Sequence, residues 1–206
     1  MKFKDDCASL VIAGTFNIAI FNNLEWVQKF LFPNEQIKSE FSLNPFASSR
    51  YTTADFRLSI VNNTLQLFLI KREERELQKL ENMALKIADY LPHTPVSGMG
   101  TNFIFESTPT DHVNINFPEP EKEKLLEEGF ETKAVVMQVK CENQAKKYIL
   151  NKIISHENNV WTFSFNYHYE IKSLVDLKEI LQPNTINGFC QESLNLMAKL
   201  YDLHLQ

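Results

Sequence analysis

The sequence predicts an α+β fold: a mostly antiparallel sheet of hairpins and a meander, packed against a long central helix and C-terminal helices. Two patterns lead to this prediction. Residues 56–60 and 65–69 alternate apolar and polar side chains on either side of a short Asn-containing link, which is typical of a hairpin. Residues 77–91 instead repeat Leu, Ala and Ile at three- and four-residue spacings, so a long amphipathic helix is expected to follow directly.

The first part of the chain is less regular. Apolar alternation over residues 10–20 predicts one or two strands, with Gly14 as a bend or bulge between them. Asn22 has the spacing of an N-cap for a short helix over residues 24–32. Residues 34–53 show no periodicity and are expected to form a long irregular loop.

The later elements follow from similar patterns. A strand is expected at 96–105, then a connection at 106–118 rich in Thr, Pro and Asn, and a short helix at 121–128. A meander and two helices should follow, with strands at 133–141, 147–154 and 160–171, one helix capped by Ser173, and one at about 188–203. We expect a single domain over residues 1–206, with possible sub-layers 1–106 and 119–206 joined by 107–118.

Charge and hydropathy narrow the possible partners. The chain has 21 Lys and Arg against 26 Asp and Glu, a formal net charge of −5, so direct binding of nucleic acid is not expected. No stretch approaches the ~18 uninterrupted apolar residues of a membrane-spanning helix, and we expect no membrane contact. The three cysteines, Cys7, Cys141 and Cys190, are widely spaced, which favours a reducing cytoplasm over a disulfide framework.

The motifs of catalysis and cofactor binding are missing from the sequence. There are only five glycines, and the close pair Gly98 and Gly100 lacks the third glycine of a dinucleotide-binding fingerprint. The five histidines never occur at metal-ligand spacing, and no serine lies in a nucleophile-elbow motif. The sequence therefore predicts no cofactor, no metal and no catalytic residue, and leans away from an enzyme.

The strand at 160–171 leaves two alternatives open. One face carries five aromatic rings, from Trp161 to Tyr169, which is typical of core packing but also of a surface that stacks single-stranded nucleic acid. The other face is polar. An enzyme whose site assembles around His93, His168 and Glu170 is the second alternative, and it requires those three side chains to converge.

Two apolar segments point instead to a protein partner or to self-association. The loop at 34–53 carries large apolar side chains, and the C-terminal helix has an apolar arc wide enough to bury two sides. We therefore predict partner binding by three residues of the loop, Phe41, Leu43 and Phe46, and three of the helix, Leu196, Leu200 and Leu203.

Residues 91–105 carry a weak resemblance to known proteins. The segment Leu-Pro-His-Thr-Pro-Val at 91–96, followed by Gly98, Gly100 and the pair Asn102-Phe103, resembles a helix-to-strand corner of sparsely distributed bacterial proteins that have no known activity. The resemblance implies an accessory subunit of a mobile or defence-type system. With the absence of catalytic motifs, it leads to the prediction of a non-enzymatic binding subunit of a larger bacterial protein assembly.

Overall fold

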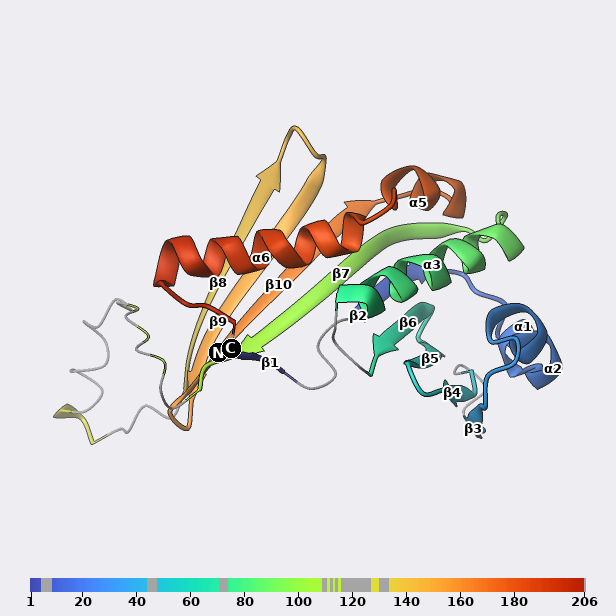
Figure 1. Cartoon of the computed structure of the whole chain (residues 1–206), viewed down its shortest axis with the longest axis horizontal. Helices are drawn as coiled ribbons and strands as arrows, with labels where there is room; N and C mark the ends of the chain where they lie inside the picture. Colours follow the sequence, from blue (N-terminus) through green and yellow to red (C-terminus); the bar gives the residue numbers. More distant parts are fainter. Residues whose placement is uncertain are drawn as a thin grey trace.

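A twisted antiparallel sheet with helices on one face forms the described part of the chain (Figure 1). This computed structural model describes residues 1–4, 9–43, 48–70, 74–108, 111, 113, 115, 127–129 and 134–205. Its strands are β1 (Lys2–Phe3), β2 (Ser9–Gly14), β3 (Lys38–Glu40), β4 (Arg50–Thr52), β5 (Phe56–Val61), β6 (Thr64–Leu69), β7 (Val96–Glu106), β8 (Ala134–Asn143), β9 (Tyr148–Glu157) and β10 (Val160–Glu170). Its helices are α1 (Ile18–Asn22), α2 (Leu24–Trp26), the π-helix η1 (Val27–Leu31), α3 (Glu74–Tyr90), α5 (Leu174–Ile180) and α6 (Thr185–Tyr201).

The strands form one continuous sheet in the order β3-β4-β5-β6-β2-β7-β10-β9-β8, and β1 pairs with the far end of β7. Every strand pair is antiparallel, as the alternation in the sequence predicts. The sheet joins the two halves of the chain, because β7 pairs with β2 on one side and with β10 on the other.

The expectation of a long central helix is corrected. The 17-residue α3 packs near β6, while α6, of the same length, crosses β9, β10 and β7 on the same face of the sheet (Figure 1). Neither helix is central, since the sheet is broad enough that one helix covers only part of it. The sheet therefore dominates the fold, and α3 and α6 each cover a different part of the same face.

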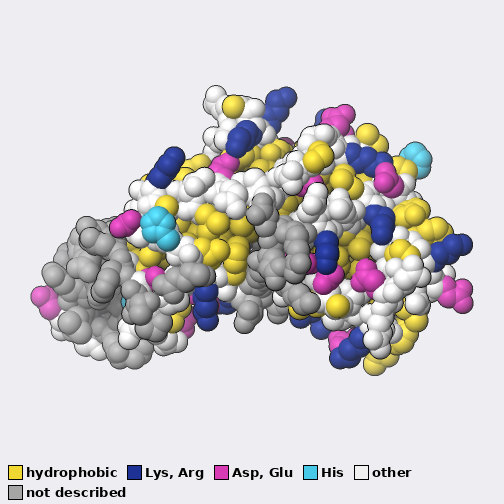
Figure 2. Space-filling view, viewed as in Figure 1, with side chains coloured by type: hydrophobic (Ala, Val, Ile, Leu, Met, Phe, Trp, Pro, Cys, Tyr) yellow, Lys and Arg dark blue, Asp and Glu magenta, His cyan; other side chains and the backbone are white. Residues whose placement is uncertain are grey.

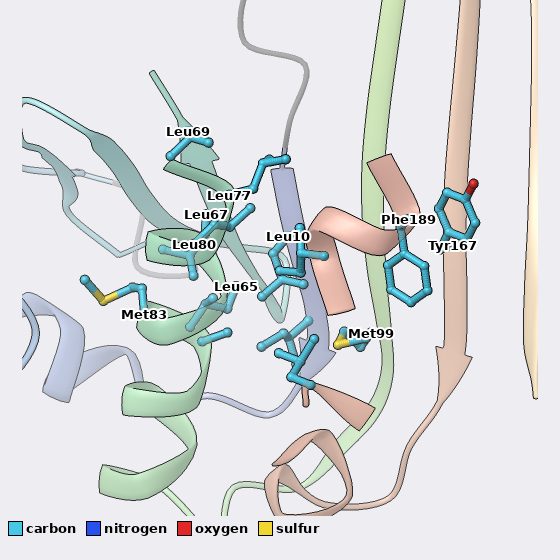
Figure 3. Close-up of a cluster of buried hydrophobic side chains, with 14 of the residues drawn as sticks. Leu10, Leu65, Leu67, Leu69, Leu77, Leu80, Met83, Met99, Tyr167 and Phe189 are labelled. Atoms are coloured by element: carbon cyan, nitrogen blue, oxygen red, sulfur yellow. The ribbon is translucent and has the colours of Figure 1, made fainter. Parts of the chain in front are cut away.

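The core lies between the sheet and these helices (Figure 3). A row of mutually paired residues crosses six strands on the helix side, and all of them are buried: Leu58, Leu67, Leu10, Thr101, Tyr167 and Leu150. From above, α3 contributes Leu77, Leu80 and Met83, and α6 contributes Phe189, to this layer. These positions are the apolar seams that the helical periodicity indicates.

Asparagine supplies the tight turns in this glycine-poor chain. The β5–β6 hairpin turns through Asn62 and Asn63, with φ of 49° and 58°, and the β9–β10 hairpin turns through Asn158 and Asn159, with φ of 50° and 61°. Left-handed conformations at both central residues suit the twist of a two-residue hairpin. The predicted hairpin and meander are confirmed with small changes at their ends.

The first third of the chain departs from the prediction. Gly14 does mark an irregularity in β2, and a Cβ there would lie 2.5 Å from the carbonyl oxygen of Pro95. The predicted second strand is wrong, because Asn17 accepts a hydrogen bond from Ala19 N and starts α1 instead. The next helix is capped by Asn23 rather than Asn22, with its side chain accepting from Trp26 N at 3.1 Å.

The supposed irregular loop at 34–53 also contains two short strands. β3 and β4 pair with each other and extend the sheet beyond β5. Each has only three residues, which is too few to show the alternation of a strand in the sequence. Most of the connection at 106–118 and of the helix expected at 121–128 lies outside the described residues.

Two caps fix the C-terminal helices. In α5 the Ser173 hydroxyl accepts from Asp176 N, and the Asp176 carboxylate accepts from Ser173 N, which completes the predicted capping box. The N-terminus of α6 is capped from α3: the buried Glu81 carboxylate accepts from Asn184 N and Ile186 N, both at 3.0 Å. This bond ties α6 to α3 and positions the corner between α5 and α6.

Candidate binding groove

A groove of about 570 Å³ opens where the β8–β9 turn, the end of β10 and the α5–α6 corner meet. Its volume falls within the range of small-molecule and peptide side-chain sites. Four parts of the chain contribute its lining: Lys146 and Lys147 from the turn, Tyr169 and Glu170 from β10, Glu179 and Ile180 from α5, and Thr185, Gly188 and Phe189 from α6.

The groove rests on an aromatic cluster. The Phe189 ring stacks on Tyr167 with centroids 4.6 Å apart, and Tyr148 lies edge-on to Tyr167 at 5.2 Å and to Tyr169 at 5.8 Å. Tyr167 and Phe189 are buried, whereas Tyr169 is half-buried and turns part of its ring toward the groove. Packed rings of this kind give a rigid apolar floor.

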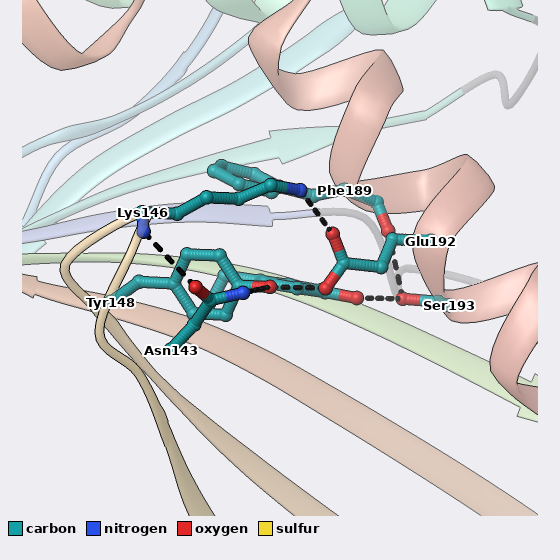
Figure 4. Close-up of polar contacts among 7 residues, drawn as sticks. Asn143, Lys146, Tyr148, Phe189, Glu192 and Ser193 are labelled. Carbon is teal, nitrogen blue, oxygen red and sulfur yellow. Dashed lines mark hydrogen bonds and ion pairs between the residues drawn. The ribbon is translucent and has the colours of Figure 1, made fainter.

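A network of hydrogen bonds and an ion pair borders the aromatic cluster, and its polar side chains bond to one another (Figure 4). The Tyr148 hydroxyl donates to one oxygen of Glu192, and Lys146 Nζ lies 2.7 Å from the other oxygen. Asn143 Nδ2 donates to the Tyr148 hydroxyl at 3.1 Å, while Asn143 Oδ1 accepts from Lys146 N at 3.0 Å. The charge of Lys146 is therefore already balanced by Glu192.

Burial raises the pKa of the tyrosine hydroxyls of this cluster. It raises the pKa of Tyr169 to about 12, with a further contribution from the negative charge of Glu192. Burial also raises the pKa of Tyr167 and of Tyr148, and Glu192 adds to both shifts. These hydroxyls are therefore neutral hydrogen-bonding groups up to a more alkaline pH than an exposed tyrosine.

Charged side chains of both signs line the groove. Lys147 stands at the turn with a left-handed φ of 56°, and Glu170 at the end of β10 and Glu179 of α5 add negative charge. All three side chains are exposed. On the face seen in Figure 2, cationic and anionic side chains of the described residues are interspersed rather than gathered into one basic patch.

The predicted partner-binding residues differ in how exposed their side chains are. Phe41 and Leu43 lie just beyond β3 with 69% and 101% of their surface exposed, and Leu200 is 53% exposed. Leu196 is half-buried against the core, and Phe46 lies outside the described residues. Leu203 was predicted to bind a partner but is only 3% exposed, because the chain turns at Asp202, after α6 ends, and folds this side chain into the core.

The aromatic face of β10 lies on the core side. Phe163, Phe165 and Tyr167 are buried, which favours core packing over the stacking of nucleic-acid bases. The opposite face carries an amide ladder in which Asn151 donates to Asn166 at 3.0 Å and Asn166 donates to Asn102 at 2.7 Å.

The three residues of the enzyme alternative do not share the groove. Glu170 lines it, but neither His93 nor His168 does. His168 instead lies against Gly98 on the amide-ladder face, where a Cβ on the glycine would be 2.9 Å from the imidazole Cε1. Among the described residues there is no group of three His, Cys, Asp or Glu side chains arranged to hold a metal ion.

Sequence reasoning missed the groove because its lining comes from separate turns and helix ends. The one relevant signal in the sequence was the wide apolar arc of the C-terminal helix, which indicated that α6 contacts other parts of the protein besides the sheet. No helix in the described ranges has the length and apolar character needed to cross a membrane. The sequence matches no protein-family model and no curated protein.

Proposed function

We propose that this protein is a non-enzymatic binding subunit that docks on a larger protein assembly by taking an extended segment of a partner protein into the groove. The observation that carries this proposal is the combination of an aromatic floor with exposed side chains of both charges, Lys147, Glu170 and Glu179, in the lining. Such a surface suits a chain segment that combines an apolar side chain with an acidic and a basic residue.

The chemistry around the groove supports binding over catalysis. None of its lining residues is Ser, Cys or His. The Thr185 hydroxyl lies within hydrogen-bonding distance of two backbone carbonyl oxygens, at 3.2 Å from Ile180 O and 2.7 Å from Gln182 O, and Lys146 is paired with Glu192. The groups that remain available are Lys147, Glu170 and Glu179, which can recognise charge but form no nucleophile–base pair.

The groove offers the ligand segment three kinds of contact. Its acidic side chain pairs with Lys147, its apolar side chain lies on Tyr169 and Phe189, and its basic side chain pairs with Glu170 or Glu179. The exposed side chains of Phe41, Leu43 and Leu200 are proposed as further contacts with the assembly. The bacterial, defence-type setting implied by the resemblance of residues 91–105 remains a prediction.

Gly188 allows the groove to be blocked without disturbing the fold. A Cβ built on Gly188 meets no atom within 4 Å, so Gly188→Leu places its side chain in open space above the floor. Glycine inside a helix costs roughly 1 kcal/mol relative to Ala or Leu, so this variant should be at least as stable as the wild type. Asn195→Leu is the matched control, because Asn195 is an exposed residue two turns further along α6 and does not line the groove.

The test is a selection of random seven-residue peptides on the wild-type protein, with counter-selection on Gly188→Leu. We expect enriched peptides that combine an acidic, a large apolar and a basic residue, and that bind Asn195→Leu as tightly as the wild type. Peptides that bind Gly188→Leu equally well would show that the groove is not the docking site. Enrichment without any charge pattern would contradict the assigned roles of Lys147, Glu170 and Glu179.

A further inference from the structure

The outermost strand β8 is a long sheet edge, and no strand among the described residues lies beyond it. It pairs with β9 through ten consecutive residues, from Ala134 to Asn143, without a bulge. From Ala134 to Val139 it contains no charge, no proline and no glycine. A long, regularly paired edge with a six-residue stretch free of charge is a ready template for another strand.

The opposite edge of the same sheet is protected in the usual ways. β3 has only three residues, and two of them, Lys38 and Glu40, are exposed and form an ion pair at 3.1 Å. Arg50 of β4 adds a second cation at 3.4 Å from Glu40. Short length and charge discourage strand addition at β3, whereas β8 is ten residues long and carries charge only at Lys140 and Glu142, near its end.

We propose that β8 pairs with β8 of a second copy of this chain, antiparallel about a two-fold axis that passes through Gln138. The two sheets then become one continuous sheet, with both helical layers on the same face. The outward backbone groups of β8 gain hydrogen bonds, and the exposed Val136, with 65% of its surface accessible, gains a cross-strand neighbour.

This register matches the side chains on the helix side of the sheet. The odd-numbered residues of β8 lie there, since Met137 pairs with the buried Ile154 and Cys141 with the buried Leu150. Pairing about Gln138 places Met137 opposite Val139 of the second copy and Val135 opposite Cys141. All the helix-side pairs are then apolar, which is the favourable arrangement for cross-strand neighbours.

The register also keeps like charges apart on the other side. Lys140 faces Val136 of the second copy and Glu142 faces Ala134, so no two like charges are opposite each other. A register centred on Lys140 would place two lysines in contact. One centred on Val139 would place Glu142 opposite Val136 and Asn143 opposite Val135, which pairs polar with apolar side chains on both faces.

Gln138 gives a direct test because it is exposed and lies on the proposed axis. Light scattering during size-exclusion chromatography, over a wide range of concentrations, should give twice the 24.0 kDa chain mass for the wild type. Gln138→Lys places two lysines opposite each other and should give the monomer mass. Asn195→Lys, which adds the same charge on the exposed side of α6, should remain dimeric.

Rescue separates this pairing from general effects of charge. An equal mixture of Gln138→Lys and differently tagged Gln138→Glu should restore a dimer that contains one copy of each, because the opposite charges now meet at the axis. A wild type that is monomeric at every concentration, a dimeric Gln138→Lys variant, or a mixture without mixed dimers would each overturn the proposal. The groove and the β8 edge are tested by different variants, so either proposal can fail alone.

Discussion

The Glu81 carboxylate of α3 caps α6 by accepting hydrogen bonds from the backbone N–H groups of Asn184 and Ile186, both at 3.0 Å. The two residues are more than a hundred positions from Glu81 in sequence, and the carboxylate itself is only 2% exposed. A helix N-terminus carries positive partial charge from free N–H groups, so a buried carboxylate is stabilised there. This bond holds the corner from which α6 extends over the sheet and forms one wall of the groove.

Replacing Glu81 should therefore weaken the whole fold. We expect Glu81→Ala to lower the free energy of unfolding by about 2–3 kcal/mol, because the buried Ile186 N–H loses its acceptor. Glu81→Gln should cost less, about 1–2 kcal/mol, since the amide retains one acceptor oxygen. Urea denaturation measures both values, and the exposed neighbour Asn82 provides the control: Asn82→Ala should change stability by less than about 0.5 kcal/mol.

Stability should fall at alkaline pH through the buried tyrosines. The pKa of Tyr169 is raised to about 12 in the folded state, against about 10 in an unfolded chain. The folded state thus favours the neutral phenol, and this contribution is complete below pH 10 and disappears as the pH rises through 12. Tyr148 and Tyr167, whose pKa values are raised in the same direction, add to the effect.

Ultraviolet titration of tyrosinate, followed together with circular dichroism, measures this behaviour. Part of the six-tyrosine signal should appear only as the protein unfolds. Glu192→Gln removes a charge that raises the pKa of Tyr148, Tyr167 and Tyr169, so ionisation should begin at lower pH in that variant. Ionisation of all six tyrosines near pH 10 without loss of structure would contradict the buried cluster.

The asparagine turns predict a specific order of variants at Asn63. Its φ of 58° is tolerated by asparagine and glycine but costs about 1–2 kcal/mol for most other residues. Asn63→Gly should change the free energy of unfolding by less than about 0.5 kcal/mol, and Asn63→Ala should lower it by about 1 kcal/mol. Equal stability of the alanine and glycine variants would argue against this turn conformation.

The end of the C-terminal helix predicts opposite outcomes for two nearby leucines. Leu203 is 3% exposed, and Leu203→Asp should lower the free energy of unfolding by more than about 3 kcal/mol because it buries a charge without a partner. Leu200 is 53% exposed, and Leu200→Asp should change it by less than about 0.5 kcal/mol. Thermal melting distinguishes them, and a destabilised Leu200→Asp would mean that this side chain is already buried in solution.

Local patterns predicted the elements whose signals are long. The β5–β6 hairpin, α3, the β8–β10 meander and the α5 capping box all follow from alternation, periodicity or cap spacing in the sequence. The α1 helix was not predicted. Phe16, Ile18 and Ile20 recur at every second residue, as in a strand, but Asn17 caps a helix that begins at Ile18. Strands of three residues such as β3 and β4 are too short to show a period.

The groove could not be predicted because its parts are brought together only by the fold. Lys147 at one turn, Glu170 at a strand end and Gly188 near the start of α6 are unremarkable in sequence, and the Glu81 bond that positions α6 spans more than a hundred residues. The exposure of Phe41, Leu43 and Leu200 but not of Leu203 likewise depends on where the chain turns after each element. Periodicity identifies an apolar side chain but not the neighbour that covers it.

The central claim is that the groove docks the protein on a partner. Its most direct test is quantitative mass spectrometry of the proteins that co-purify, from the native host, with tagged wild type, Asn195→Leu and Gly188→Leu, all at matched expression and with equal thermal stability. The account predicts a stoichiometric partner with the first two proteins and at least a tenfold loss of that partner with Gly188→Leu. The same partner at the same amount on Gly188→Leu, or none on the wild type, would contradict it.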